Sequence, residues 1–176
     1  MRLNSDFILY HPLWEKADDL LINQHKLFNR LIDIFLIACS IGIKDDKQIP
    51  NEAIENQLSQ PKNIGRNTYQ SAINTDLDDT LTLMLQNAII NSNYVSFDLD
   101  ERLKLAFNPD YDNKKFSAAT TLISFANYGI EQIFKNINTD LPSMTIADDL
   151  YKYLNSLKDD KYDDLVANIT LEDMKK

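Results

Sequence analysis

Apolar residues recur at spacings of three and four along most of the chain, which is the spacing of one face of an α-helix. A run of this kind near the C-terminus covers residues 162–169, and residues 6–10 favour a short strand or an extended arm. The main apolar runs predict helices over residues 12–23, 27–41, 75–91, 97–107, 114–136 and 146–157. The expected fold is therefore all-α, a compact helical bundle of about six helices.

The segment 27–41 is apolar around nearly its whole circumference. Such a helix lies in the middle of a bundle or is shared with a second chain, and the pattern leaves both open. We expect Gly42 to end this helix as a left-handed C-cap. Gly129 lies inside the predicted helix 114–136, where glycine costs about 1 kcal/mol relative to alanine. A close helix crossing would explain that position.

Two further helix starts are predicted from capping residues, namely Thr75 for the helix 75–91 and Ser96 for the helix 97–107. Between the second and third predicted helices, residues 44–74 form a polar interval that we expect to be a long loop, with one or two helical turns in residues 52–58. The whole chain, 1–176, is expected to be a single helical domain, with a core bundle over 1–140 and a C-terminal helical extension over 141–176.

The composition of the chain mainly excludes or disfavours classes of function. The formal charge of −9 and the pI near 4.6 disfavour broad binding to a phosphate backbone. The chain has 3 glycines, so a glycine-rich phosphate loop is excluded, and with it Walker-type hydrolysis and dinucleotide fingerprints. The single cysteine, Cys39, lies in an apolar run and is expected in the core. No secretory pattern or membrane-length apolar run occurs, so we expect a cytoplasmic protein that does not enter a membrane.

The sequence contains only incomplete metal-binding motifs. Asn108, Asp110 and Asp112 match the first ligands of a calcium loop, but Asn113 replaces the required glycine and Ala119 the bidentate glutamate. His11 and His25 belong to no metal motif, and His11 is expected as a surface or capping residue. Acidic pairs at helix starts are explained by the helix dipole. We therefore predict no catalytic, cofactor-binding or metal-ligating residues, and no enzyme activity.

Basic residues offer one candidate contact with nucleic acid. Lys62 and Arg66 lie in the polar interval, and Lys114 with Lys115 precedes a long helix. A solvated loop is the competing interpretation of the first pair. No lysine or arginine occurs between Arg66 and Arg102, whereas six acidic residues do, so that part of the surface should repel DNA and suit a basic partner protein. Tyrosines near helix ends are further candidate anchors for a partner, namely Tyr94, Tyr111, Tyr151 and Tyr153.

Two stretches together carry a family resemblance. Residues 27–43 read LFNRLIDIFLIACSIGI and precede a polar segment leading to Pro50, and residues 125–133 read FANYGIEQI. Their order and separation resemble the accessory proteins encoded beside bacterial DNA phosphorothioation (Dnd) modification and restriction genes, and most of all the group called Dnd system-associated protein 4. The resemblance covers about residues 1–140. The helix layout is also loosely similar to the phosphorothioation protein that binds nicked DNA as a tetramer, from which this chain departs in its acidity and longer tail.

The resemblance implies a non-enzymatic accessory or regulatory subunit of a bacterial antiphage defence complex, acting through protein–protein contacts. A larger defence protein, an ATPase or a nuclease, is the expected partner, and DNA would be reached through it. One alternative is an oligomer that binds DNA directly through Lys62, Arg66, Lys114 and Lys115. Another is a phage-encoded acidic inhibitor, for which the net charge fits although the charges are mixed.

Overall fold

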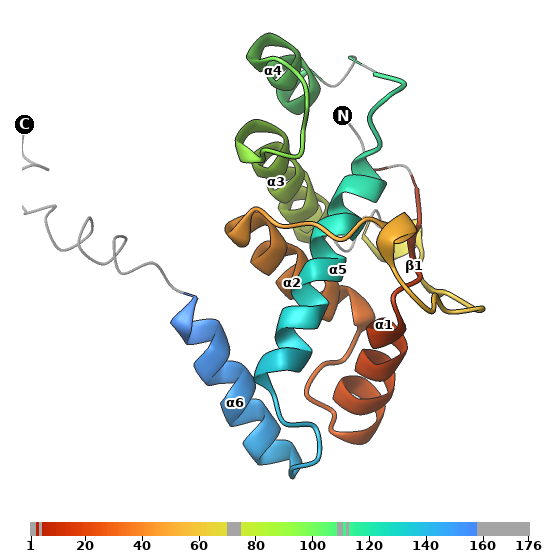
Figure 1. Ribbon diagram of the computed structural model, residues 1–176, viewed down its shortest axis with the longest axis vertical. Coiled ribbons are helices and arrows are strands. Elements are labelled where there is room, and N and C mark those ends of the chain that lie inside the picture. The colour runs from red at the N-terminus through yellow and green to blue at the C-terminus, as the bar shows by residue number, and fades with distance from the viewer. Residues whose placement is uncertain (1–2, 4, 70–74, 109–110, 112, 158–176) are drawn as a thin grey trace, which may run out of the picture.

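The computed structural model describes residues 3, 5–69, 75–108, 111 and 113–157. Its elements are β1 (Phe7–Leu9), α1 (Pro12–Ala17), the π-helix η1 (Asp18–Gln24), α2 (Leu31–Asp45), the 3-10 turn η2 (Asn51–Ala53), β2 (Lys62–Ile64), the 3-10 turn η3 (Arg66–Thr68), α3 (Thr75–Asn91), α4 (Leu99–Phe107), α5 (Ala118–Asn136) and α6 (Ser143–Ser156). The prediction of a helical bundle of about six helices is confirmed, and a two-stranded sheet is added to it. In Figure 1, α2 and α5 lie in the middle, α4 at one end of the long axis and α6 towards the other.

The centre of the fold is a close antiparallel crossing of α2 and α5, which form the largest contact between two elements. Gly129 faces the backbone of Ala38, and a Cβ added to it would lie 2.7 Å from the Ala38 Cα and closer still to the Ala38 carbonyl group. Gly42 faces Phe125 in the same way, with its added Cβ 2.9 Å from the Phe125 Cα. The crossing expected at Gly129 is therefore present, and it uses a second glycine.

Gly42 lies inside α2, so the prediction that it caps this helix is wrong. The helix continues to Asp45, and Asp46 takes the left-handed conformation, with φ 47° and ψ 52°. Aspartate tolerates that conformation better than most residues do. The Asp46 carboxylate also accepts hydrogen bonds from Ser92 Oγ at 2.6 Å and from the Asn93 side-chain amide at 2.6 Å. The crossing with α5 therefore explains why position 42 is glycine. The end of α2 is stabilised by the contacts of Asp46.

The first two predicted helices begin or end differently from the pattern. After Ala17 the chain continues as the π-helix η1, and Lys26 has a left-handed φ of 53° that ends the helical path. Arg30 is extended and precedes α2, so the predicted start at residue 27 is four residues too early. Leu27 and Phe28 still pack against the core, but from a connecting segment. Apolar periodicity alone does not reveal such a connection.

The polar interval is more ordered than a plain loop. Strand β2 pairs antiparallel with β1 in the register Phe7 to Ile64 and Leu9 to Lys62, which confirms the short strand near the N-terminus. The expected turns in residues 52–58 are reduced to η2, which begins at Asn51. Residues 70–74 of the interval lie outside the described residues.

Two other helices begin later than predicted, and their N-cap residues show why. Asp98, not Ser96, is the N-cap of α4, and its carboxylate accepts the Glu101 amide at 2.8 Å. Ser117 caps α5, so this helix begins four residues after the predicted start at 114. Helix α3 begins at Thr75 and ends at Asn91, in agreement with the pattern.

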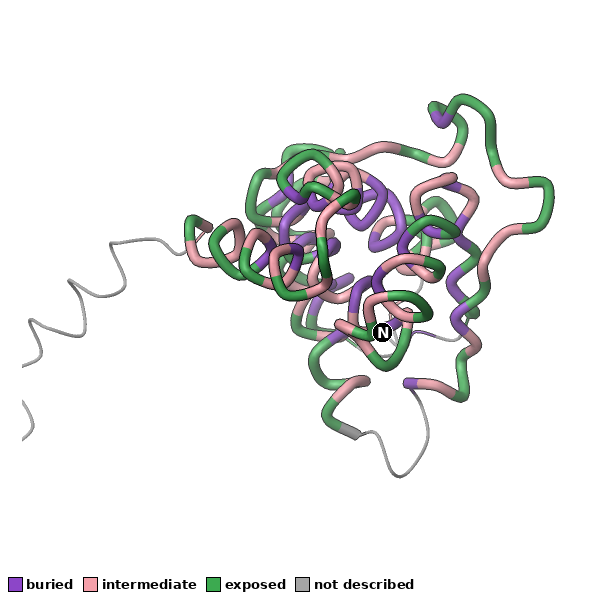
Figure 2. The backbone as a smooth tube through the Cα atoms, turned by 90° about the horizontal axis from the view of Figure 1, so that it is seen from below, coloured by how far each residue is buried: buried purple, intermediate pink, exposed green. Residues whose placement is uncertain are grey.

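Buried residues gather where the helices meet, as the purple segments of the backbone in Figure 2 show. Phe7 stacks on Phe35 with ring centroids 4.6 Å apart, and Trp14 lies 6.0 Å from the same ring. Helix α6 contributes Ile146 and Leu150 to this core. The predicted helical run 162–169 lies outside the described residues.

Candidate functional site

Helix α4 carries an apolar row on its solvent side. Leu99, Leu103 and Phe107 are 65%, 43% and 62% exposed. Their spacing of four places them along one side of the helix. We call these three residues the α4 stripe. Single apolar side chains are common on protein surfaces, and three along one helix make this row a candidate interaction surface.

The buried side of α4 fixes the helix to α3, which is its main contact. Leu105 and Ala106 are buried there, and Gln86 Nε2 on α3 donates a hydrogen bond to the Ala106 carbonyl at 3.0 Å. At the other edge, Tyr111 Oη and Asn113 Nδ2 donate to the Glu101 carboxylate at 3.1 and 2.6 Å. The exposed row is therefore mounted on a helix whose orientation is set by its neighbours.

Arg102 ties α4 to the end of α3. Its guanidinium donates to the carbonyl oxygens of Phe97 at 3.0 Å, Ile90 at 3.1 Å and Ser92 at 2.9 Å, and also to that of Val95. Helix α3 leaves its last carbonyls without intrahelical partners, and Arg102 satisfies one of them. This cation therefore has a structural role in the connection between the two helices.

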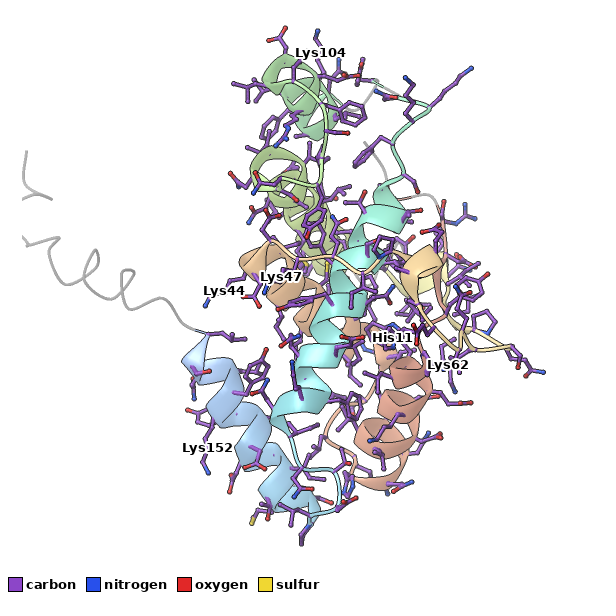
Figure 3. The ribbon with its side chains drawn as sticks, in the orientation of Figure 1. His11, Lys44, Lys47, Lys62, Lys104 and Lys152 are labelled. Atoms are coloured by element: carbon purple, nitrogen blue, oxygen red, sulfur yellow. The ribbon has the colours of Figure 1, made fainter. Side chains whose placement is uncertain are left out.

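Both acidic and basic residues flank the α4 stripe. Asp98 and Asp100 are exposed in and before the first turn of α4, and Lys114 and Lys115 are exposed in the segment between α4 and α5. Lys104 lies 3.7 Å from the Asp100 carboxylate, an exposed pair of the kind that contributes little to stability. Residues 76–107 carry six acidic residues and two basic ones, a formal charge of −4, but three of these carboxylates lie at the start of α3, away from the end of α3 that contacts α4. In Figure 3, Lys104 lies at the end of the molecule that α4 forms.

The predicted basic contact residues do not form one group in the described contacts. Lys62 Nζ lies 2.7 Å from the Asp18 carboxylate, and this hydrogen bond raises the pKa of Lys62, with Asp19 and Glu15 adding to the shift. Arg66 is exposed and lines a surface depression together with Asp6. The Arg66 backbone amide donates to the Asp6 carboxylate at 2.7 Å, which lowers the pKa of Asp6. Both cations therefore have acidic neighbours.

The second predicted basic pair lies in another place. Lys114 and Lys115 are exposed before α5, and Lys115 lines a depression shared with Tyr94 and Phe97. Figure 3 shows Lys62 beside α1, whereas Lys115 borders the α3–α4 connection. Direct contact of these four residues with DNA stays a prediction.

A polar network along the middle of α5 was not predicted from the sequence. Asn127 is fully buried, accepts the Trp14 indole N–H at 3.0 Å, and donates to the Ile49 carbonyl and to Asn51 Oδ1, each at 3.1 Å. His11 is buried as well, so the surface expectation is wrong, and the capping expectation is confirmed. Its Nδ1 accepts the Leu13 amide at 3.2 Å, which leaves the proton on Nε2, 3.0 Å from the Glu131 carboxylate.

This network has the features of a structural one. Among the described residues, every buried side-chain nitrogen or oxygen has a hydrogen-bond partner. Asn127 uses its carbonyl and amide to hold α1 and the segment after α2 against α5, which is a structural role. The sequence gives only a weak signal of this network, because an asparagine within an apolar helix face is equally compatible with an exposed position.

Cys39 is buried, and its thiol lies 3.6 Å from the Leu122 carbonyl oxygen. Burial raises the pKa of this thiol, which disfavours the reactive thiolate.

Within the described ranges, no group of three or more histidine, cysteine or acidic side chains lies close enough together to hold a metal ion. The calcium-loop match cannot be placed, because Asp110 and Asp112 lie outside the described residues. In the same part of the chain, none of the helices has the length and apolar character needed to cross a membrane.

Comparison with protein-family models, with curated proteins and with solved structures gave no match. The resemblance to accessory proteins of phosphorothioation systems therefore stays a prediction. The class that the fold defines is a compact, mostly helical protein with a small two-stranded sheet, and α4 carries three exposed apolar residues on its surface.

Proposed function

We propose that this protein is a non-enzymatic accessory or regulatory subunit of a bacterial DNA phosphorothioation-linked defence complex, acting in the cytoplasm through protein–protein contacts. The observation that carries the proposal is the α4 stripe, an exposed apolar row on a helix that packs on α3. The family resemblance supplies the identity of the system. A larger ATPase or nuclease is the proposed partner, and DNA is reached through it.

Two features support contact with protein rather than with DNA. The chain has a net charge of −9. Lys62, one of the four candidate DNA contacts, is held by Asp18. An acidic surface with apolar anchors suits a basic protein surface, because complementary charge speeds association and fixes orientation.

The test is recovery of the tagged protein from its native host, followed by measurement of the mass and composition of the complex. Recovery with a DNA-handling ATPase or nuclease is the expected result. A lone oligomer that carries nucleic acid, and whose DNA binding weakens steeply with salt, would instead identify a direct DNA binder. Cleavage of DNA or hydrolysis of nucleotide by the purified chain alone would contradict the proposal.

A further inference from the structure

We propose that the C-terminal segment of this chain, residues 162–169, packs as a short amphipathic helix into a groove on α2 and so covers that groove within the same molecule. The groove lies among the described residues, and the segment lies outside them. Three observations carry the proposal: the lining of the groove, the point where the chain leaves α6, and the apolar pattern of the segment. It stands whether or not the proposed function is correct.

One side of α2 stays partly open to solvent. The crossing with α5 buries the side that carries Ala38 and Gly42. Along another side, Ile37 and Ile43 are only partly buried and Ser40 is exposed. A depression of about 220 Å³ lies between this side and the end of α6. We call it the α2 groove, and its lining residues are Ile37, Ser40, Ile41, Lys44, Leu154 and Leu157.

The lining of the α2 groove suits an apolar occupant. A second depression shares Ser40 and Lys44 with it and extends to Ile43 and to Met84 on α3. The Ser40 hydroxyl donates to the Leu36 carbonyl at 2.9 Å. An apolar side chain can therefore cover Ser40 without leaving its hydroxyl unpaired, and it removes further apolar surface from water.

The chain leaves helix α6 at the edge of this groove. Helix α6 ends at Ser156, and Leu157, the last described residue, belongs to the lining. The Leu157 carbonyl accepts a hydrogen bond from Lys44 Nζ, and Figure 3 shows Lys44 on the side of α2 where α6 ends. Residues 158–161 then span up to about 14 Å, which lets the chain turn back over the groove.

The segment that follows has the pattern of an amphipathic helix. Tyr162, Leu165, Val166 and Ile169 are spaced as one face of a helix of about two turns. Residues 158–176 contain six acidic residues and four lysines, so their charge is mixed and does not select the contact. The apolar face of the segment and the apolar lining of the groove supply the complementarity.

Attachment to the chain favours this occupant over others. A short flexible connection gives an effective concentration of order 1 mM. A second copy of the chain, or another protein at about 1 µM, would need roughly a thousandfold higher affinity to compete equally. The C-terminal segment of the same molecule is therefore the preferred cover.

The first experiment measures amide hydrogen exchange of residues 162–169 in the full chain by NMR, with a free peptide of residues 158–176 as reference. Exchange in the chain should be about tenfold slower, as expected for a contact with a Kd of about 0.1 mM at an effective concentration of about 1 mM. The same protection is expected at two protein concentrations. Equal rates in chain and peptide, or protection that rises with protein concentration, would overturn the proposal.

Variants of the segment test its apolar face. Leu165→Asp with Ile169→Asp places two carboxylates on that face, whereas Ala167→Asp with Asn168→Asp places two on the opposite face as the control. The first pair should abolish the protection, and the control should retain most of it. Retained protection in the first pair would contradict docking through this face.

A variant of the groove tests the other partner of the contact. Ser40→Glu places a larger, charged side chain in the middle of the lining, and Ser96→Glu changes another exposed serine outside it. Ser40→Glu should remove the protection of residues 162–169, whereas Ser96→Glu should leave it unchanged. Thermal unfolding checks that both variants are folded. Equal protection in the two variants would show that the segment does not occupy the α2 groove.

The last experiment places a photo-cross-linking amino acid at position 165 of the purified full chain. The expected product is a cross-link within one molecule, to a peptide that contains residues 37–44 or 154–157. A cross-linked dimer, or a cross-link only to other parts of the chain, would overturn the proposal. None of these outcomes bears on the proposed function, which recovery of the complex from the host tests separately.

Discussion

The substitution Gly129→Ala tests the central crossing directly. The added Cβ would lie 2.7 Å from the Ala38 Cα, and closer still to the Ala38 carbonyl group. Non-bonded carbon atoms prefer separations of about 3.5–4.0 Å. The obstructing atoms are backbone, so no side-chain rotation can relieve the overlap. Helices α2 and α5 must therefore separate locally by about 1 Å, which loosens the largest contact in the fold.

Two opposing effects determine the result. Alanine is favoured over glycine in a helix interior by about 1 kcal/mol. Overpacking of a well-packed core costs about 1–3 kcal/mol, and occasionally more, and a clash with backbone belongs at the upper end. We expect a net loss of about 2 kcal/mol in the free energy of unfolding. In a chain of this length that corresponds to a fall in Tm of about 4–8 °C.

The assay is urea and thermal unfolding followed by circular dichroism, with Gly65→Ala as the matched control. Gly65 has φ −63°, and an added Cβ there would meet no atom within 4 Å. The control should therefore be neutral or slightly stabilising, because alanine restricts the unfolded chain. Gly42→Ala should resemble Gly129→Ala, since it faces the Phe125 backbone. A Gly129→Ala protein as stable as the wild type would refute the close crossing.

Four further predictions follow from single side chains. Asn127→Ala leaves the buried Trp14 indole N–H without its acceptor and should cost about 2–3 kcal/mol, measured by tryptophan fluorescence during urea unfolding. Arg102→Met removes the donor shared by several carbonyl groups and should cost about 2 kcal/mol, with faster amide exchange in the α3–α4 connection. Cys39 should react with a thiol reagent only as fast as the protein unfolds, and rapid labelling of the native state would contradict its burial. Burial, aided by the hydrogen bond to Asp45, raises the pKa of Tyr128 to about 12. The stability contributed by Tyr128 is therefore complete below pH 10 and lost towards pH 12, and ultraviolet titration of phenolate compared with Tyr128→Phe checks this window.

The helical core was predictable because it depends on patterns that are local in the sequence. The apolar face of α5 and its interior glycine were sufficient to predict a long core helix with a close crossing at Gly129. The role of Gly42 was not predictable, because a glycine near the end of an apolar run is usually a cap, and only the partner helix shows that its Cβ would meet Phe125. Strand β2 was missed for a similar reason, since its three residues are stabilised by pairing with β1 and not by a pattern of their own.

The candidate site shows the same limit. The acidic interval from Arg66 to Arg102 was visible in the sequence, and the preference for a basic partner over DNA that it favours stays a prediction. The exposed row was not, because α4 has apolar residues on two sides and only packing on α3 shows that Leu105 is buried while Leu103 is exposed. A short helix with two apolar sides is ambiguous until its neighbours are known.

The relation between the crossing and the α4 stripe suggests how the protein presents its surface. The crossing of α2 and α5 buries backbone against backbone at Gly42 and Gly129, which makes the centre of the fold stiff. Helix α4 is held chiefly by α3 and by hydrogen bonds from one cation, Arg102. Such a connection opens at lower free energy than a core crossing does, because it depends on partly exposed hydrogen bonds. The stiff centre thus supports a helix whose orientation depends on Arg102, so loss of this residue should speed amide exchange in α4 while the crossing of α2 and α5 stays protected.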